Sequence, residues 1–189
     1  MMEGRIKTAL EKAMERAASM REVSREEIDR MEYVPRGRSI GASFMHDKHF
    51  DLKTALAGIP AGIAKYVREG VQDVLLMNIT LSADETASQS NRRAMEGILA
   101  IKQDKAQATR VLGEIDLLLQ HYLQAINQTK EKFKQELEMR RRMARRQGVR
   151  SREMETMEFR EEWANVVRQL NAGYEINLAE LKDRLRKID

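Results

Sequence analysis

Apolar residues recur every three or four positions along most of the chain, and this spacing predicts a protein built from amphipathic α-helices. A first helix is expected over residues 6–20, where one face carries Ile6, Leu10, Ala13, Ala17 and Met20. A second, short helix should follow Ser24, which forms a capping box with Glu27. It is expected to end at Pro35, because the stretch from Pro35 to Gly41 has the proline and glycines of a loop.

The next part of the chain predicts two helices joined by a turn. Asp51 is placed to cap a short helix that reaches Ala57. The glycine-flanked run at 58–62 is a turn, with Pro60 at the first position of the following helix. The buried face of that helix is marked by Ile63, Val67, Val71 and Val74. A strand over 74–81 is an alternative, although it would have no evident pairing partner.

A capping box of Ser82 and Glu85 predicts that another helix begins near Ala83. From residue 94 its apolar positions alternate three and four apart, as in the seam of a coiled coil. The seam has twelve positions, all apolar except Lys105 and Thr129: Ala94, Ile98, Ile101, Lys105, Ala108, Leu112, Ile115, Leu119, Tyr122, Ile126, Thr129 and Phe133.

Two structures fit this region. One is an unbroken helix from 83 to 147, about 100 Å long at 1.5 Å per residue. The other breaks at Gln103, where Asp104 would cap a new helix and Gln107 would complete its capping box. The sequence leaves both alternatives open.

The last segment is a strong amphipathic helix, because its apolar residues have a mean spacing near 3.6. They are Phe159, Trp163, Val167, Leu170, Tyr174, Leu178, Leu181, Leu185 and Ile188. Gly148 is the only helix-breaking residue between the two long amphipathic segments, so the chain is expected to fold back there. In a symmetric hairpin about this turn, Ile188 would lie near Val111 and Phe159 near Arg140.

The hairpin would cover the incoming helix only from about residue 111 to the tip, so the earlier part of the seam needs another partner. The first eighty residues can supply it. We therefore expect an all-α protein with an N-terminal helical bundle over residues 1–103. A long, coiled-coil-like antiparallel helical hairpin should follow over residues 104–189, with a basic tip at 140–152.

Composition narrows the functional classes. The 189 residues contain no cysteine, which excludes disulfides, thiol catalysis and thiolate metal sites. The N-terminal stretch lacks the apolar core of a signal peptide, and the longest apolar run, at 74–77, is too short to span a bilayer. We therefore expect a cytoplasmic protein without a transmembrane segment.

Seven arginines and no acidic residue lie between positions 140 and 152. They are Arg140, Arg141, Arg142, Arg145, Arg146, Arg150 and Arg152. Clustered arginines bind phosphate backbones, but the glutamates that follow, between 153 and 162, can neutralise them across the hairpin. Met139 and Met143 add flexible apolar contacts at the same tip.

We interpret the tip as the docking element of a non-enzymatic helical scaffold protein that binds a protein partner. An RNA- or ribosome-associated factor that binds phosphate through the arginines is the alternative. Leu99, Leu118 and Leu123 lie beside the seam, so the hairpin has surplus apolar surface. A homodimer, or packing of the hairpin against the bundle, would cover that surplus.

Catalytic and cofactor signals are weak. His46 and His49 would share one face of a helix and are weak metal candidates, but no third ligand follows at metal-binding spacing. Phosphate-binding glycine loops, nucleophile elbows and zinc-protease motifs are absent from the sequence. We therefore expect no catalytic residues, no metal and no cofactor.

Three stretches together resemble an uncharacterised bacterial family of largely α-helical proteins. They are Ala9-Leu10-Glu11 with Glu15-Arg16, then Asn91-Arg92-Arg93-Ala94-Met95-Glu96-Gly97, then residues 159–163. The resemblance covers most of the chain. It implies a helical, cytoplasmic, bacterial protein, and it assigns no function to any residue.

Overall fold

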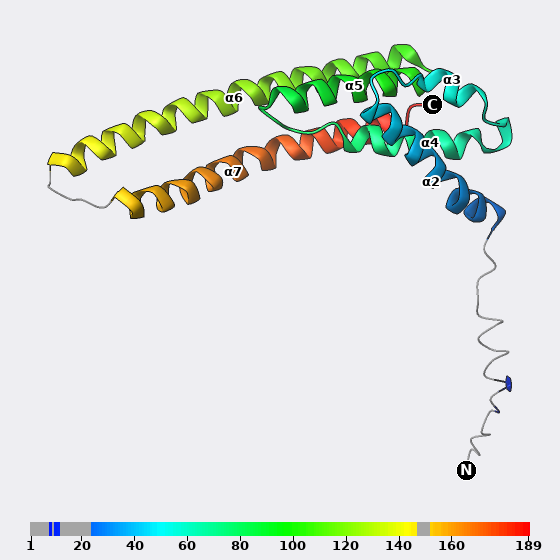
Figure 1. Ribbon diagram of the computed structural model, residues 1–189, viewed down its shortest axis with the longest axis horizontal. Helices are drawn as coiled ribbons and strands as arrows, with labels where there is room; N and C mark the ends of the chain where they lie inside the picture. The colour runs from blue at the N-terminus through cyan, green and yellow to red at the C-terminus, as the bar shows by residue number, and fades with distance from the viewer. Residues whose placement is uncertain (1–7, 9, 12–23, 147–151) are drawn as a thin grey trace.

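The computed structural model describes residues 8, 10–11, 24–146 and 152–189, and within them it contains only helices (Figure 1). The expected all-α class is confirmed. The elements are α2 (Arg25–His46), α3 (Leu52–Ala57), α4 (Ala61–Met77), α5 (Glu85–Ile101), α6 (Lys105–Arg146) and α7 (Arg152–Arg186). Most of the helix expected over 6–20, and Gly148 itself, lie outside the described residues.

Helix α2 continues through Pro35, so the loop expected between Pro35 and Gly41 is wrong. A proline inside a helix removes one backbone hydrogen bond, but Pro35 is exposed, where water can bind the freed carbonyl group. The two glycines of the same stretch, Gly37 and Gly41, are buried against α4. Tertiary contact with α4 therefore outweighs the weak helix propensity of this segment.

The caps of α2 and α3 are those that the sequence predicts. Ser24 and Glu27 form the capping box of α2. The Asp51 carboxylate accepts from the backbone amides of Lys53 and Thr54 and starts α3. Helix α4 begins directly after Pro60, which is its N-cap residue.

The chain over residues 74–81 completes α4 and then forms a linker, so the alternative of a strand there is wrong. Helix α5 begins at Glu85, two residues later than expected, with Asp84 as N-cap. The Ser82 hydroxyl instead accepts from the amide of Asp84. The linker is fixed by Asn91, a buried side chain that makes two 2.9 Å hydrogen bonds to the backbone of Thr80.

A break separates α5 from α6, and this decides between the two alternatives for the long helix. Asp104 accepts from the amide of Gln107 at 2.9 Å and caps α6. The backbone amides of Gln103 and Asp104 donate hydrogen bonds to the main-chain oxygen of Asp189. The Lys102 ammonium donates a hydrogen bond to the carbonyl of Ile188. The α5–α6 linker therefore holds the C-terminal end of α7.

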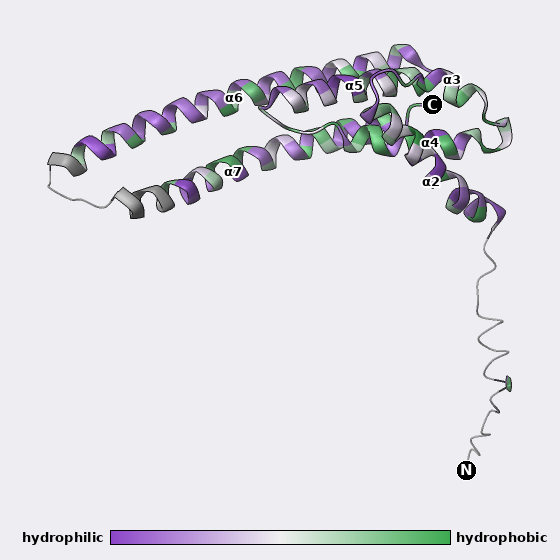
Figure 2. Ribbon diagram, in the orientation of Figure 1, coloured by the Kyte–Doolittle hydropathy of each residue, from purple (hydrophilic) through white to green (hydrophobic). Residues whose placement is uncertain are grey.

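One core connects the helices at the base of the structure. Ala94, Ile98 and Ile101 of α5 are buried together with side chains of α4, α6 and α7. In Figure 2 the hydrophobic colour gathers where α2 and α4 meet the base of α7, while the outer half of α6 is largely hydrophilic. The seam before residue 104 is thus buried by earlier helices, as its pattern requires.

Helices α6 and α7 pack against each other and project well beyond the other helices (Figure 1). Near the base, Arg184 pairs with Glu114 at 2.5 Å, one position from the symmetric register. Farther out, Phe159 stacks on Phe133 instead of lying near Arg140. Arg140 pairs with Glu162, three residues beyond its symmetric partner Phe159, so the contacts scatter to both sides of a simple fold-back.

Candidate interaction surface

The outer end of α6 carries the described part of the predicted tip. Met139 and Met143 are 56% and 64% exposed, which is high for large apolar side chains. The three arginines between them, Arg140, Arg141 and Arg142, are exposed as well. The two methionines thus flank three arginines on a surface far from the core, as expected of an adaptable contact surface.

Glutamates neutralise part of this arginine cluster. Arg140 is held by Glu136 at 2.7 Å on its own helix and by Glu162 of α7 at 2.9 Å. Hydrogen bonds to these two carboxylates raise the pKa of Arg140 above its usual value. Arg142 approaches Glu138 at 3.8 Å. Arg141 has no ion pair among the described residues, so it is the most available cation of the three.

Other predicted site residues lie elsewhere. The side chains of Arg145, Arg146, Arg150 and Arg152 fall outside the described part of the chain. His46 is the last residue of α2, and His49 lies after it in a loop, so the two do not share a helical face. Within the described ranges, His and acidic side chains form no group that could hold a metal ion.

An aromatic cluster next to the tip was not predicted as a site. Phe133 of α6 stacks on Phe159 with ring centroids 4.5 Å apart, and it contacts Trp163 at 5.2 Å. All three rings are only partly buried. The periodicity places each ring on the seam, but only the paired helices show that the seam is incompletely covered there.

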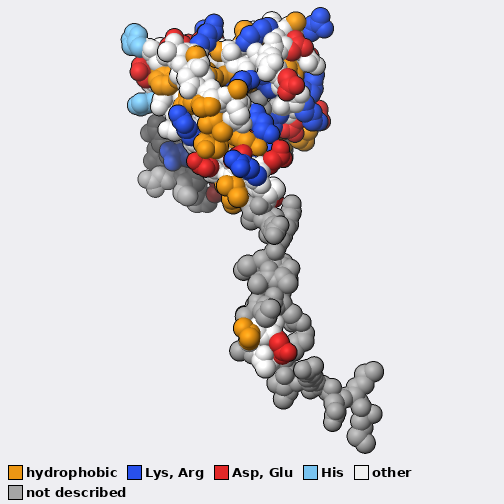
Figure 3. Space-filling model, turned by 90° about the vertical axis from the view of Figure 1, so that its right-hand side faces the viewer, with side chains coloured by type: hydrophobic (Ala, Val, Ile, Leu, Met, Phe, Trp, Pro, Cys, Tyr) orange, Lys and Arg blue, Asp and Glu red, His pale blue; other side chains and the backbone are white. Residues whose placement is uncertain are grey.

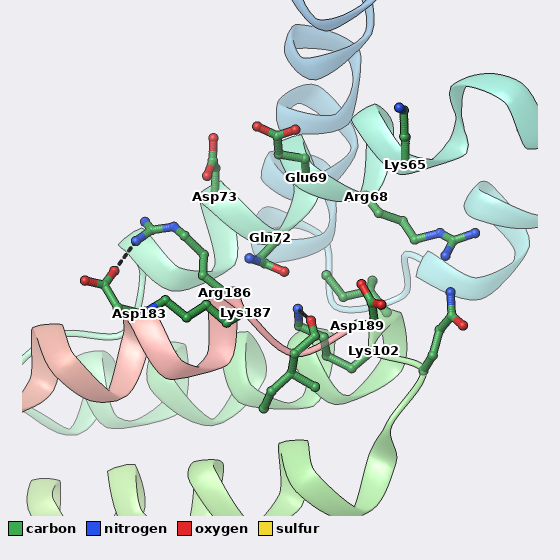
Figure 4. Close-up of a pocket in the computed structure, with 13 residues that line it drawn as sticks. Lys65, Arg68, Glu69, Gln72, Asp73, Lys102, Asp183, Arg186, Lys187 and Asp189 are labelled. Carbon is green, nitrogen blue, oxygen red and sulfur yellow. Dashed lines mark hydrogen bonds and ion pairs between the residues drawn. The ribbon is translucent and has the colours of Figure 1, made fainter. Parts of the chain in front are cut away.

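A cavity at the opposite end of the molecule is another candidate site. It lies between α4, the α5–α6 linker and the end of α7. It has a volume of about 740 Å³, and charged side chains dominate its lining (Figure 4). Glu69, Asp73 and Asp183 are each paired with an arginine, at 3.1, 2.9 and 2.6 Å. Arg68 and Arg186 extend toward opposite ends of the cavity in Figure 4, so its charges do not converge on one point.

The end of the molecule that faces away from the outer parts of α6 and α7 carries both hydrophobic and charged side chains. Figure 3 shows hydrophobic side chains gathered there, with Lys, Arg, Asp and Glu side chains around them. Both signs of charge surround the apolar area, so it favours neither an acidic nor a basic partner.

The stretch at 91–97, on which the family resemblance rests, has structural roles. Asn91 fixes the α4–α5 linker, as described above. Arg93 donates to the backbone carbonyls of Phe44, Asp47 and Lys48 at the end of α2, and its guanidinium lies 4.3 Å from the centre of the Phe44 ring. These contacts give Asn91 and Arg93 roles in packing and capping.

Comparison with known proteins assigns the chain to a family. Residues 53–187 match a family of unknown function (DUF6657), and since this is more than half of the chain, the protein belongs to that family. The expectation of an uncharacterised family is thereby confirmed. The curated proteins and the solved structures contain no significant match. No helix in the described part of the chain is long and apolar enough to cross a membrane.

Proposed function

We propose that this protein is a non-enzymatic scaffold that docks a protein partner through the outer part of α6 and α7. We call this part the distal arm, residues 127–146 of α6 and 152–170 of α7. The observation that carries the proposal is the exposure of Met139 and Met143 beside Arg141, on helices that project away from the core. Interfaces are enriched in methionine and arginine relative to the rest of protein surfaces.

Binding of RNA through the arginine tip is the second candidate. The density of arginine over 140–152 supports it. The ion pairs of Arg140 and Arg142 with glutamates count against it, because a paired arginine is less able to replace a phosphate counterion. Protein docking uses the methionines as well as the arginines, and it therefore accounts for more of the surface.

Site-specific photo-crosslinking in cells tests the proposal. A photoreactive amino acid would replace Met139 or Met143, and Met77 on α4, which is 74% exposed, is the matched control. We expect a discrete adduct from the two distal positions that is destroyed by protease, resists ribonuclease, and disappears when Arg141→Glu is added. Adducts from Met77 alone, or none from either distal position, would contradict docking through the arm.

The RNA candidate has its own test. Binding of total RNA to the intact protein would be measured over a salt series, beside a variant with glutamine at Arg140, Arg141, Arg142, Arg145 and Arg146. Phosphate binding predicts affinity that falls steeply with salt and is lost in the variant. Affinity that the substitution leaves unchanged would exclude the tip as an RNA site.

A further inference from the structure

Burial of the α6–α7 seam changes along its length. Near the base, seam residues such as Ile115 and Leu178 are 0% and 1% exposed. Burial continues on α6 as far as Ile126, at 7%. Beyond it, the described seam residues of the outer part are only partly buried, and these are Thr129, Phe133, Phe159, Trp163, Val167 and Leu170.

Helix α5 accounts for the difference. It packs on the basal half of α6 as a third helix, and its Ala94 and Ile98 join the same core as Ile115 and Leu178. The N-terminal turn of α5 reaches the level of Gln120 and Leu123, with which it lines a small depression. Farther out, α6 and α7 continue together beyond the end of α5 (Figure 1). Two helices leave both flanks of their seam open to water, and a third covers one flank.

The half-buried aromatic rings suit a binding surface. Phe133, Phe159 and Trp163 form one contact cluster at the level where the third helix is missing. Rigid aromatic side chains lose little conformational entropy on binding, and they dominate the energetics of many interfaces. A helix laid over this cluster would extend to the distal arm the three-helix packing that α5 provides at the base.

Charge selects the kind of helix. The described side chains of the distal arm, at 127–143 and 159–170, include eight Lys and Arg against five Asp and Glu. This excess of three makes up most of the net charge of the whole chain, +4. An acidic partner is attracted to such a surface, whereas a second copy of the same arm brings a like net charge.

We propose that the distal arm binds an acidic amphipathic helix of a partner protein, which lies over Phe133, Phe159 and Trp163 as a third helix. This inference rests on the proposed docking function and names the chemistry of the partner. Apolar residues of the bound helix contact the aromatic cluster. Its carboxylates face Arg141 and the other cations of the distal arm.

Trp163 is the only tryptophan of the chain and lies in the cluster, so its fluorescence reports binding directly. The probe is a peptide of about six helical turns, with leucine on one face and glutamate elsewhere. A second peptide carries lysine in place of every glutamate. We expect the acidic peptide to shift Trp163 emission to the blue in a saturable manner, and the lysine peptide to bind at least about tenfold more weakly, which corresponds to about 1.4 kcal/mol.

Three variants localise the effect. Phe133→Ala removes part of the cluster, and Arg141→Glu reverses an exposed cation without altering packing. Each should weaken the acidic peptide about tenfold. Leu117→Ala on the basal half of α6, where Leu117 is 56% exposed, should leave binding unchanged. Circular dichroism checks that each variant keeps its helix content. If Phe133→Ala loses helix content, Arg141→Glu alone serves as the test.

Several outcomes would overturn the inference. One is equal binding of both peptides, and another is no change in Trp163 emission with either. A third is a dimer that forms with rising protein concentration in sedimentation experiments and shifts Trp163 emission to the blue without peptide. Competition with the crosslink at Met139 separates the two proposals. Adducts that persist under saturating acidic peptide contradict this inference and leave the docking function standing. A complete lack of adducts removes the docking function itself.

Discussion

At the scale of single residues, the crossing of α2 over α4 depends on two glycines, Gly37 and Gly70, which have no side chain. A Cβ atom on Gly37 would lie 2.0 Å from the carbonyl oxygen of Val67. One on Gly70 would lie 2.1 Å from the carbonyl oxygen of Val34. Both distances end at backbone atoms, which cannot rotate away as a flexible side chain does. Glycine is therefore needed at both positions for the close approach of the two helices.

Gly37→Ala and Gly70→Ala should each destabilise the protein by about 3 kcal/mol or more, because the two backbones would have to separate. Gly113→Ala and Gly173→Ala are the matched controls, since a Cβ atom there meets nothing within 4 Å. We expect these two to stabilise by about 0.5–1 kcal/mol through helix propensity. Urea unfolding followed by circular dichroism measures all four, and similar effects in both pairs would contradict the close-packing argument.

Lys102 is a buried cation whose ammonium donates to the carbonyl of Ile188. Burial lowers its pKa from the usual 10.5, and the Asp189 carboxylate opposes that shift. Between the lowered pKa and 10.5 the unfolded chain binds more protons than the folded one, so stability rises with pH in this window. Below the window the charged ammonium stays buried at a constant cost.

Lys102→Met removes this titration. As the pH rises toward 10.5, the parent protein should gain stability relative to the variant, because only the parent sheds a buried charge. The comparison cancels the ionisation of tyrosines and of other lysines, which both proteins share. Urea unfolding at successive pH values measures the difference. Curves that stay parallel throughout would show that burial does not perturb Lys102.

At the scale of elements, Arg93 joins α5 to the end of α2 by capping three backbone carbonyls and covering the Phe44 ring. Arg93→Met should destabilise the protein by about 1–3 kcal/mol, since the carbonyl of buried Phe44 loses its charged donor. Its neighbour Arg92 is exposed, so Arg92→Met should change stability by less than about 0.5 kcal/mol. Thermal unfolding of the pair provides the test, and equal losses would refute a specific role for Arg93.

Local rules predict the helices well where one rule governs, and poorly where distant residues decide. The capping box at Ser24 and the N-cap at Asp51 depend on local sequence, and both are found as expected. Pro35 and Gly37 indicate a loop locally, but contact with α4 makes that segment helical. The predicted start of α5 is two residues too early, because the Ser82 hydroxyl accepts from the amide of Asp84 in the linker and does not cap the helix.

The candidate site shows the same division. The exposed methionines and arginines at 139–143 follow from composition, and the structure describes them at one end of α6. The cluster of Phe133 with Phe159 and Trp163 could not be identified from the sequence, because its partners lie on different helices. Incomplete burial is a property of the packed pair, and periodicity reports only which residues face the seam.

At the scale of the whole molecule, the core and the distal arm should differ in stability. The core joins side chains of α2 to α7, the six helices described, from Phe44 and Leu52 to Ile188. Among the described residues, the distal arm is held by the contacts between its own two helices. Regions with few buried contacts open locally at free energies far below that of global unfolding. The amides of α6 beyond Ile126 should therefore exchange hydrogen sooner than those of α4 and α5.

A pair of truncations separates the two regions. Ile115→Ala should destabilise the whole protein by about 2–5 kcal/mol and speed exchange in α4 and α5 as well as in α6, because Ile115 is fully buried in the shared core. Phe133→Ala should speed exchange only in the distal arm. Hydrogen exchange read by mass spectrometry resolves the segments. If Phe133→Ala also accelerated exchange in α4, arm and core would unfold as one unit, and a helix bound to the arm would then stabilise the entire protein.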